Sequence, residues 1–212
     1  MRFLRRLIIC ILLLALVAVA GYCYARYIEP HRLAVETLQV SGAGLASPVR
    51  LVVFSDVHLG NGVDTDDLRQ LVDQINALQA DAVLFLGDLY DNYEQYEGNV
   101  EADAAALAAI DAPVKLAVWG NHDMGGGAYR IYPEVLEKGG FVLLENESFA
   151  ADKLGICFAG AADVIFGQPD ISALWADGLY RVLLVHEPDY ALEVTDVPLQ
   201  LSGHMAVRFT CR

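Results

Sequence analysis

The chain opens with a long apolar segment. Arg2, Arg5 and Arg6 come first, and no charged residue then appears from Leu7 to Ala25. A helix of that length spans roughly 28 Å, at about 1.5 Å per residue, which is close to the hydrocarbon thickness of a bilayer. The leading arginines predict that the N-terminus stays in the cytoplasm and that the rest of the chain lies on the extracytoplasmic side of the cell membrane.

Residues 1–27 therefore have two interpretations. They form a single-pass membrane anchor, or a signal peptide, since Ala18-Val19-Ala20 resembles a cleavage site. The anchor is favoured because the apolar run continues past that site. A buried core helix is disfavoured by the three arginines at its start.

Beyond residue 27, apolar runs and helical patterns alternate in the manner of an α/β domain. Residues 28–48 are interpreted as a short strand, within 32–40, followed by a Gly/Ser/Pro linker. Continuous apolar runs of four to eight residues are typical of strands buried in a mostly parallel sheet. Such runs lie at 49–54, 82–87, 114–120, 141–146, 154–160, 180–185 and 199–203.

Apolar residues at helical spacing separate several of these strands. One helix follows a cap at Asp64 or Thr65, and its predicted apolar face consists of Leu68, Leu71, Val72, Ile75 and Leu78. Further helices are expected at about 100–110, 129–138 and 171–176. The second of these ends at Gly139-Gly140, a typical helix stop.

Polar side chains follow five of the apolar runs, at the point where each expected strand ends. They are Asp56 and His58, Asp88 and Asp91, Asn121 and His122, His186, and His204. Because the carboxyl ends of strands share one edge of an open α/β sheet, these groups should converge there. Singly, each is more often a turn, a cap or a structural histidine. Together, five strand ends with metal-capable groups predict a shared metal site.

Composition narrows the chemistry. A net charge of -14 argues against a nucleic-acid-binding surface, which needs a basic patch. The four cysteines have neither the spacing of a disulfide framework nor that of a zinc cluster. Carboxylate, amide and imidazole ligands without thiolates suit Mn, Fe, Zn or similar divalent ions.

The combination of motifs resembles the calcineurin-like metallophosphoesterases. The matching residues are Asp56-x-His58, Gly87-Asp88-x-x-Asp91, Gly120-Asn121-His122-Asp123, His186 and Gly203-His204. The apolar N-terminus and the run LLVHEPD are similar to the membrane-anchored bacterial subgroup. The resemblance implies a two-sheet sandwich flanked by helices over residues 49–204. It also implies an enzyme that hydrolyses a phosphodiester, pyrophosphate or related phosphoester, including lipid- or envelope-linked ones.

The same resemblance implies a role for each site residue. It assigns the ligands of two divalent metal ions as Asp56 and His58 for the first, Asp88 as the bridge, and Asn121, His186 and His204 for the second. His122 then acts near the leaving group as a catalytic acid, and Asp91 helps to orient it. The implied partners are a membrane and a phosphoester substrate, while no oligomeric state is predicted.

The last motif departs from the family pattern. The family has Gly-His-x-His, whose second histidine binds the first metal, but this chain has Ala206 at that position. The first metal keeps Asp56, His58 and Asp88, with water in the remaining place. The family continues through further strands, so the C-terminal strands are expected to be missing. The run 199–203 is then expected to have an open edge.

Residues 205–212 are interpreted as an aberrant tail. Codons for Met205 to Cys211, read from one base earlier, permit His-Gly-Gly-Gln-Val-His-Leu, which is the expected family text. We therefore expect an out-of-frame deletion or sequencing error near His204. A truncation or a natural end is the alternative, and the downstream DNA decides between them.

Three functions remain open at this stage. The leading one is a membrane-anchored, metal-dependent phosphoesterase. The others are an inactive remnant that binds at most one metal, and an anchored binding module that holds a structural ion. The lost ligand and strands predict weak or no activity, and poor solubility, for this chain.

Overall fold

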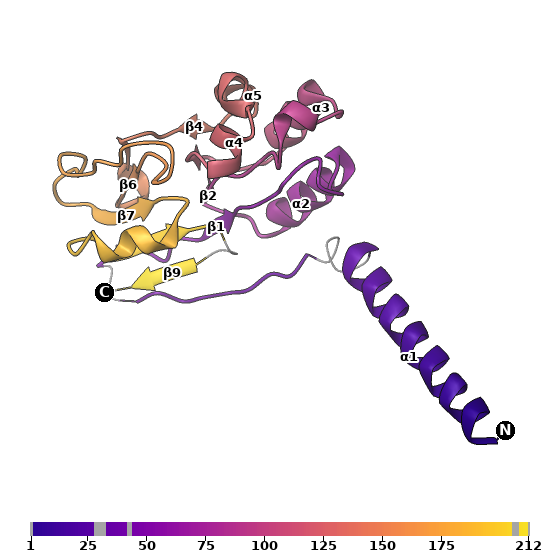
Figure 1. Cartoon of the computed structure of the whole chain (residues 1–212). Coiled ribbons are helices and arrows are strands. Elements are labelled where there is room, and N and C mark those ends of the chain that lie inside the picture. The colour runs from indigo at the N-terminus through magenta and orange to yellow at the C-terminus, as the bar shows by residue number, and fades with distance from the viewer. Residues whose placement is uncertain (1, 28–32, 42–43, 205–207, 212) are drawn as a thin grey trace. The chain divides into compact units, whose positions relative to one another are not determined.

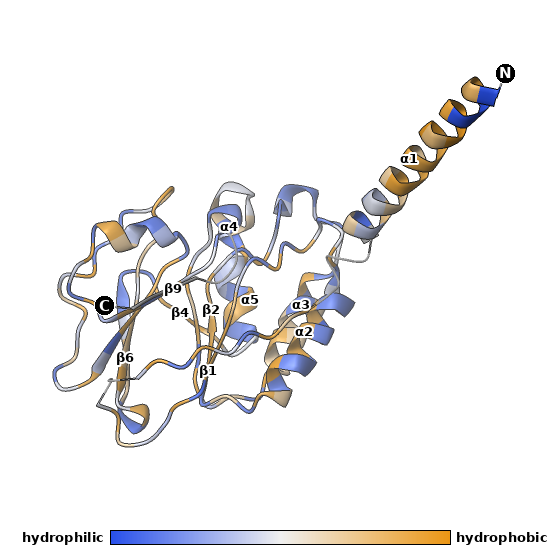
Figure 2. Cartoon of the chain, turned by 90° about the horizontal axis from the view of Figure 1, so that it is seen from below, coloured by the Kyte–Doolittle hydropathy of each residue, from blue (hydrophilic) through white to orange (hydrophobic). Residues whose placement is uncertain are grey.

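A computed structural model describes residues 2–27, 33–41, 44–204 and 208–211 (Figure 1). Residues 1–37 and 38–212 form two separate compact units. In the first, α1 (Arg2–Tyr27) is a helix long and apolar enough to cross a membrane. Figure 2 shows it apolar along most of its length, with a hydrophilic start. A signal sequence near the N-terminus has the same length and composition, so both sequence interpretations stay open.

The short strand expected within 32–40 is wrong over its described part. Residues 33–41 form neither helix nor strand. In the described chain no β-strand pairs with them. Without such a partner, the β-favouring composition of this segment has no ladder to join.

The first sheet of the second unit is parallel throughout. Its strands are β1 (Leu51–Phe54), β2 (Ala82–Phe85), β3 (Lys115–Ala117) and β4 (Val142–Leu143), in that spatial order. All four were expected from their apolar runs. Parallel pairing puts their carboxyl ends at one edge, as the sequence predicted.

The second sheet has a parallel centre and antiparallel edges. Its strands, in order, are β5 (Glu147–Ala151), β6 (Ile156–Gly160), β7 (Tyr180–Leu184), β8 (Leu199–Ser202) and β9 (Arg208–Cys211). The strands β6, β7 and β8 are parallel, whereas β5 and β9 run antiparallel to their neighbours. The expected open edge at β8 is wrong, because β9 pairs with it from Ser202↔Arg208 to Leu199↔Cys211.

The two sheets pack against each other, which confirms the sandwich. Successive residues of β2 face opposite sides. Leu84 packs in the inter-sheet core with Phe158, Val182 and Leu201, while Phe85 lies in the core beneath the helices. That outer core is covered by α2 (Thr65–Ala77), α3 (Val100–Ala108) and α5 (Tyr132–Lys138) (Figure 1).

The outer face of the second sheet has a different cover. Val185, just beyond β7, packs there with Ile171, Tyr190 and Val197. Tyr190 belongs to a 3₁₀ helix, η5 (Pro188–Leu192). Helices α2, α3 and α5 therefore flank the first sheet, and loops with one 3₁₀ helix cover the second.

Sequence signals located most helices. Asp64 caps α2 in a reciprocal capping box with Asp67, as expected. The helix expected at 171–176 is wrong, because that segment is a turn followed by irregular chain. There the Asp170 side chain accepts a hydrogen bond from Ser172 N (3.0 Å), a local bond that competes with helix formation.

Short helices were not predicted from the sequence. They are α4 (Asn121–Gly125), η2 (Tyr93–Gln95) and η4 (Asp152–Leu154), whereas the helix expected at about 129–138 is divided into η3 (Ala128–Arg130) and α5. Of these, α4 matters most, since it begins directly after β3 with two predicted site residues.

Candidate metal centre

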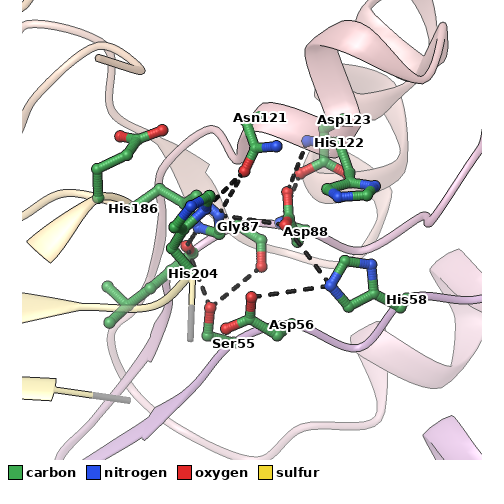
Figure 3. Close-up of polar contacts among 12 residues, drawn as sticks. Ser55, Asp56, His58, Gly87, Asp88, Asn121, His122, Asp123, His186 and His204 are labelled. Carbon is green, nitrogen blue, oxygen red and sulfur yellow. Dashed lines mark hydrogen bonds and ion pairs between the residues drawn. The ribbon is translucent and has the colours of Figure 1, made fainter. Parts of the chain in front are cut away.

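The predicted site residues meet where strands from both sheets end. Asp56 and His58 follow β1, Asp88 follows β2, and Asn121 starts α4 after β3. From the second sheet, His186 follows β7 and His204 follows β8. Figure 3 shows these side chains pointing toward one another. The single sheet edge expected from the sequence is therefore two edges that face a common site.

The backbone turns sharply at four of these residues. Asp56, His58, Asp88 and His204 have φ values of 56°, 51°, 61° and 69°, in the left-handed region that side chains disfavour. Such conformations cost roughly 1–3 kcal/mol each and persist only where surrounding contacts enforce them. Their concentration at one site indicates that side-chain direction here outweighs backbone preference.

Hydrogen bonds between strand ends enforce two of these turns. Asp56 N donates to Gly87 O (3.1 Å), and His58 N donates to Asp88 O (3.1 Å). Gly203 N donates to His186 O (2.9 Å), which links the ends of β7 and β8 in the same way. The loops are thus joined through their backbones before any side chain is considered.

Glycines next to the site allow this close approach. A Cβ on Gly120 would lie 2.2 Å from Asp88 Oδ1, and one on Gly87 would lie 2.5 Å from Gly120 N. A Cβ on Gly203 would lie 2.0 Å from Ser55 Oγ. The glycine in each motif therefore makes room for a neighbouring strand end.

Asp88 is the buried centre of the site. Its Oδ2 lies 3.1 Å from His186 Nε2 and 3.6 Å from His58 Nε2. Its Oδ1 accepts a hydrogen bond from His122 N (2.8 Å). The carboxylate thus faces both histidines with one oxygen and is held in direction through the other.

Asp123 fixes the loop that carries Asp88. It is fully buried, and its carboxylate accepts hydrogen bonds from Asp88 N (2.8 Å), Leu89 N (3.0 Å) and Tyr90 N (3.2 Å). The sequence motif included Asp123 without assigning it a role. Three consecutive amides pointing at one carboxylate give it a positioning role for that loop.

Asn121 joins the two histidines of the second sheet. Its Oδ1 lies 3.1 Å from His186 Nε2 and 2.9 Å from His204 Nδ1. The other ring nitrogen of His186, Nδ1, lies 2.6 Å from Leu86 O. A carbonyl can only accept, so Nδ1 carries a proton and Nε2 is the nitrogen directed at the site.

Asp56 gives the clearest observation in favour of a bound cation. Its Oδ2 is buried and has no hydrogen-bond partner. A buried carboxylate oxygen without a donor is costly unless something positive compensates for it. Single ligand atoms from Asp56, Asp88 and His186 lie within 4.8 Å of one another, as do those from His58, Asp88 and His122. The residues present therefore fit a divalent metal ion.

The protein without metal balances these charges with protons. Burial acts against the charged form of Asp56, but the neighbouring His58 and Ser55 side chains hold its pKa below its usual range. Burial likewise opposes the charge of His186, yet the Asp88 carboxylate raises its pKa to about 9. The neighbouring Asp56 carboxylate raises the pKa of His58 despite its burial. A divalent ion must displace such protons to bind.

His122 and Asp91 lie beside this cluster. His122 Nδ1 lies 2.7 Å from the backbone carbonyl of Asp91, and its side chain is 41% exposed. The Asp91 carboxylate lies closer to His58 Nδ1 (3.2 Å) than to His122 Nδ1 (3.7 Å). Asp91 thus contacts His122 mainly through its backbone, and His58 through its side chain.

Two other residues were missed by sequence reasoning, the half-buried Ser55 and the buried Asp103. Ser55 Oγ lies 3.3 Å from Leu86 O, directly beside Asp56. Asp103, a buried charge in the Ala-rich α3, accepts hydrogen bonds from Thr65 Oγ1 (2.7 Å) and Tyr96 Oη (2.8 Å). The available signal for Asp103 was a lone aspartate on the apolar face of a predicted helix.

Ala206, where the sequence lacks the family's second histidine, lies outside the described residues.

The chain is similar in sequence to known metallophosphoesterases. A family model described as calcineurin-like phosphoesterase matches residues 49–208. The chain is 38% identical over 204 residues to the metallophosphoesterase YkuE of Bacillus subtilis, covering 90% of this chain and 70% of that protein. It is 27% identical over 224 residues to a zebrafish (Danio rerio) transmembrane protein with metallophosphoesterase domain, covering 94% and 49%. It is 24% identical over 187 residues to the metallophosphoesterase Cj0846 of Campylobacter jejuni, covering 80% and 47%.

Proposed function

Because the chain belongs to the calcineurin-like phosphoesterase family, we propose that it hydrolyses a phosphoester at a centre of two divalent metal ions. The observation that carries this proposal is the position of Asp88. It is buried between histidines of both sheets, and it belongs to both groups of metal-capable side chains. Its Oδ2 faces a histidine from each sheet, so this carboxylate could lie between two ions.

The ligand arrangement follows from the two sides of Asp88. Toward the first sheet lie Asp56 and His58, with Asp56 Oδ1 at 3.8 Å from His58 Nε2. Toward the second sheet lie the other three predicted ligands, Asn121, His186 and His204. Ions of the Mn, Fe or Zn class suit these oxygen and nitrogen donors.

Ions held here supply positive charge for the phosphoryl oxygens and lower the pKa of a bound water toward neutrality. The residues of the chain hold the metal ligands in position and donate protons. The left-handed turns and the hydrogen bonds between strand ends hold the ligands in place. A preorganised site of this kind pays no reorganisation energy when charge develops on the substrate.

His122 is proposed as the acid that protonates the departing alcohol oxygen. Its Nδ1 is engaged by the Asp91 carbonyl, so its Nε2 is the nitrogen left for proton transfer. Its half-exposed position suits a group that must contact substrate. An alkoxide is a poor leaving group, so a proton delivered to that oxygen lowers the barrier.

The membrane assignment is part of the proposal. It is supported by the apolar helix α1, by the arginines before its apolar run and by the transmembrane zebrafish relative. On this basis the catalytic unit lies on the extracytoplasmic side of the cell membrane, and its substrate is an envelope or lipid-linked phosphoester.

A specific observation favours low activity for this chain. Ala206 stands where the family pattern has a metal-binding histidine. The first metal therefore has one protein ligand fewer and is expected to bind more weakly. A remnant that keeps one ion without turnover is the second candidate.

Hydrolysis of bis(p-nitrophenyl) phosphate by the detergent-solubilised chain tests the proposal. We expect slow release of p-nitrophenolate that needs added Mn²⁺ and stops with a chelator. His186→Ala should abolish it, whereas Asp152→Asn, an exposed aspartate in η4, should leave it unchanged. Turnover that ignores the chelator, or that survives in His186→Ala, contradicts the proposal.

A further inference from the structure

Two large apolar side chains lie exposed on the loop between β6 and β7. Ile165 is 56% exposed and Phe166 is 55% exposed. They are adjacent in the sequence, and we name this exposed pair the apolar rim. Exposed apolar residues that cluster together often mark a binding surface.

Hydrogen bonds hold this loop in one conformation. Asp163 Oδ1 accepts hydrogen bonds from Ile165 N (3.0 Å) and Phe166 N (2.6 Å), and Gly167 N donates to Asp163 O (2.9 Å). Val164 N donates to Glu187 Oε2 (3.1 Å). Both carboxylates are buried, and Glu187 directly follows His186. The rim is therefore exposed on a fixed loop anchored beside a predicted metal ligand.

Phe166 also packs against the helix that carries His122. A Cβ placed on Gly125 would lie 2.8 Å from Phe166 Cζ, so the ring lies directly against this glycine. Gly125 is three residues after His122 in α4, and residues at that spacing are neighbours on one helix face. The apolar rim thus reaches from the second sheet to within about one helical turn of the proposed acid.

We propose that the apolar rim binds the apolar group of the alcohol that leaves the phosphate, so that the substrates are phosphoesters of an alkyl or aromatic alcohol. This inference rests on the proposed function, because His122 marks the leaving-group side only if it acts as the acid. An apolar group there would cover Phe166 and Ile165 from water, which is favourable in proportion to the area covered. A phosphate with a polar alcohol gains nothing from this surface.

The test is to measure by calorimetry the affinities of three probes, phenyl phosphate, butyl phosphate and inorganic phosphate. The protein is the Mn²⁺-loaded, detergent-solubilised chain. Phe166→Ala should weaken phenyl and butyl phosphate about tenfold and inorganic phosphate less than about twofold. Phe166→Leu should retain most of the butyl phosphate affinity. Leu192→Ala, at a more exposed apolar residue in η5, is the control and should change none of the three.

The outcomes separate the rim from the catalytic proposal. Selectively weaker binding of both organic phosphates, or of one of them, by Phe166→Ala supports the proposed role of the apolar rim. Which probe is affected shows whether the rim prefers alkyl or aromatic groups. Equal weakening of all three probes, no weakening, or no phosphate binding by the parent overturns it. Binding with the expected selectivity but without hydrolysis of any ester contradicts the proposed function, and with it the leaving-group role of the rim, whereas hydrolysis without this selectivity contradicts the rim alone.

Discussion

At the scale of single residues, Asp91 contacts His122 through its backbone carbonyl and His58 through its carboxylate. The Asp91 carbonyl, rather than its carboxylate, is the group 2.7 Å from His122 Nδ1. Removing the imidazole removes the proposed acid, whereas amidating Asp91 keeps the carbonyl that orients it. His122→Ala should therefore reduce turnover more than Asp91→Asn.

We expect His122→Ala to lower kcat about a hundredfold or more with little change in the number of metal ions bound. Asp91→Asn should lose less, since His122 keeps its orienting partner and only the ion pair with His58 is changed. Steady-state kinetics with metal analysis of both variants provides the check. Equal losses of kcat would show that the Asp91 side chain, not its carbonyl, matters for the acid.

The protonation of His186 predicts a pH effect on the metal-free protein. Its pKa is raised from 6.5 to about 9 by Asp88 despite burial. A raised folded-state pKa stabilises the fold fully below pH 6.5, and that contribution is lost as pH rises through about 9. Thermal unfolding of chelator-treated protein should therefore occur at lower temperature at pH 9.5 than at pH 6.5.

Manganese should reverse this trend, because the ion competes with the same proton and binds better as the proton leaves. His186→Asn has no proton to lose and should flatten the pH dependence of the metal-free protein. A melting temperature of the parent that is constant or rises across this pH range would refute the assignment.

The missing histidine gives a gain-of-function prediction. Ala206→His restores the family's Gly-His-x-His pattern after Gly203. We expect the added ligand to raise Mn²⁺-dependent turnover about tenfold or more, the range over which ligand-sphere changes act. Ala206→Gln, of similar size but a poor metal ligand, is the comparison. Equal activity of both variants and the parent would mean that position 206 takes no part in the site.

At the scale of elements, the glycines after β2 and β3 set the distance between strand ends. Gly87 has φ +89 and would bring a Cβ to 2.5 Å from Gly120 N, whereas Gly178 has φ +78 and open space around it. The two positions share backbone strain and differ in contact. They form a matched pair for separating the two effects.

Gly178→Ala should cost about 1–2 kcal/mol of unfolding free energy from its left-handed conformation alone. Gly87→Ala should cost clearly more and should also weaken Mn²⁺ binding, because the added methyl group forces apart the loops bearing Asp88 and Asn121. Denaturant titrations and metal binding measure both. Similar losses for the two variants would mean that contact between the strand ends adds nothing.

The strands with a continuous apolar run were predictable, including the two-residue β4, whereas most other short or exposed elements were not. Continuous apolar runs located β1, β2, β3, β6, β7 and β8 because burial leaves that pattern. The edge strand β5 (Glu147–Ala151) is mostly exposed and has no such run, and α4 is only one turn long. The pairing of β9 depends on a neighbouring strand, which the sequence of residues 205–212 does not reveal.

Most of the candidate site was predictable for a related reason. Ligands at the ends of apolar runs can be read directly, since the runs themselves show where the strands stop. The sequence did not indicate that these strand ends belong to two sheets. It also did not indicate that Asp123 and Asp163 hold loops in place by accepting hydrogen bonds from backbone amides. Such contacts depend on loop conformations that leave little pattern in the sequence.

At the scale of the whole molecule, the site exists only where the two sheets come together. The first sheet contributes Asp56, His58, Asp88 and Asn121, and the second contributes His186 and His204. Asp88 Oδ2 contacts histidines from both. Metal bound at this centre should therefore stabilise the packing of the sheets as well as support catalysis.

The most direct test of the account is a calorimetric titration of Mn²⁺ into the purified 212-residue chain and into its Asp88→Asn variant at pH 7.5. The account predicts about two ions per parent chain, one of them weakly bound, and the loss of at least one ion in the variant, which retains shape but not bridging charge. No binding by the parent, or the same number of ions with the same affinities in both proteins, would contradict it.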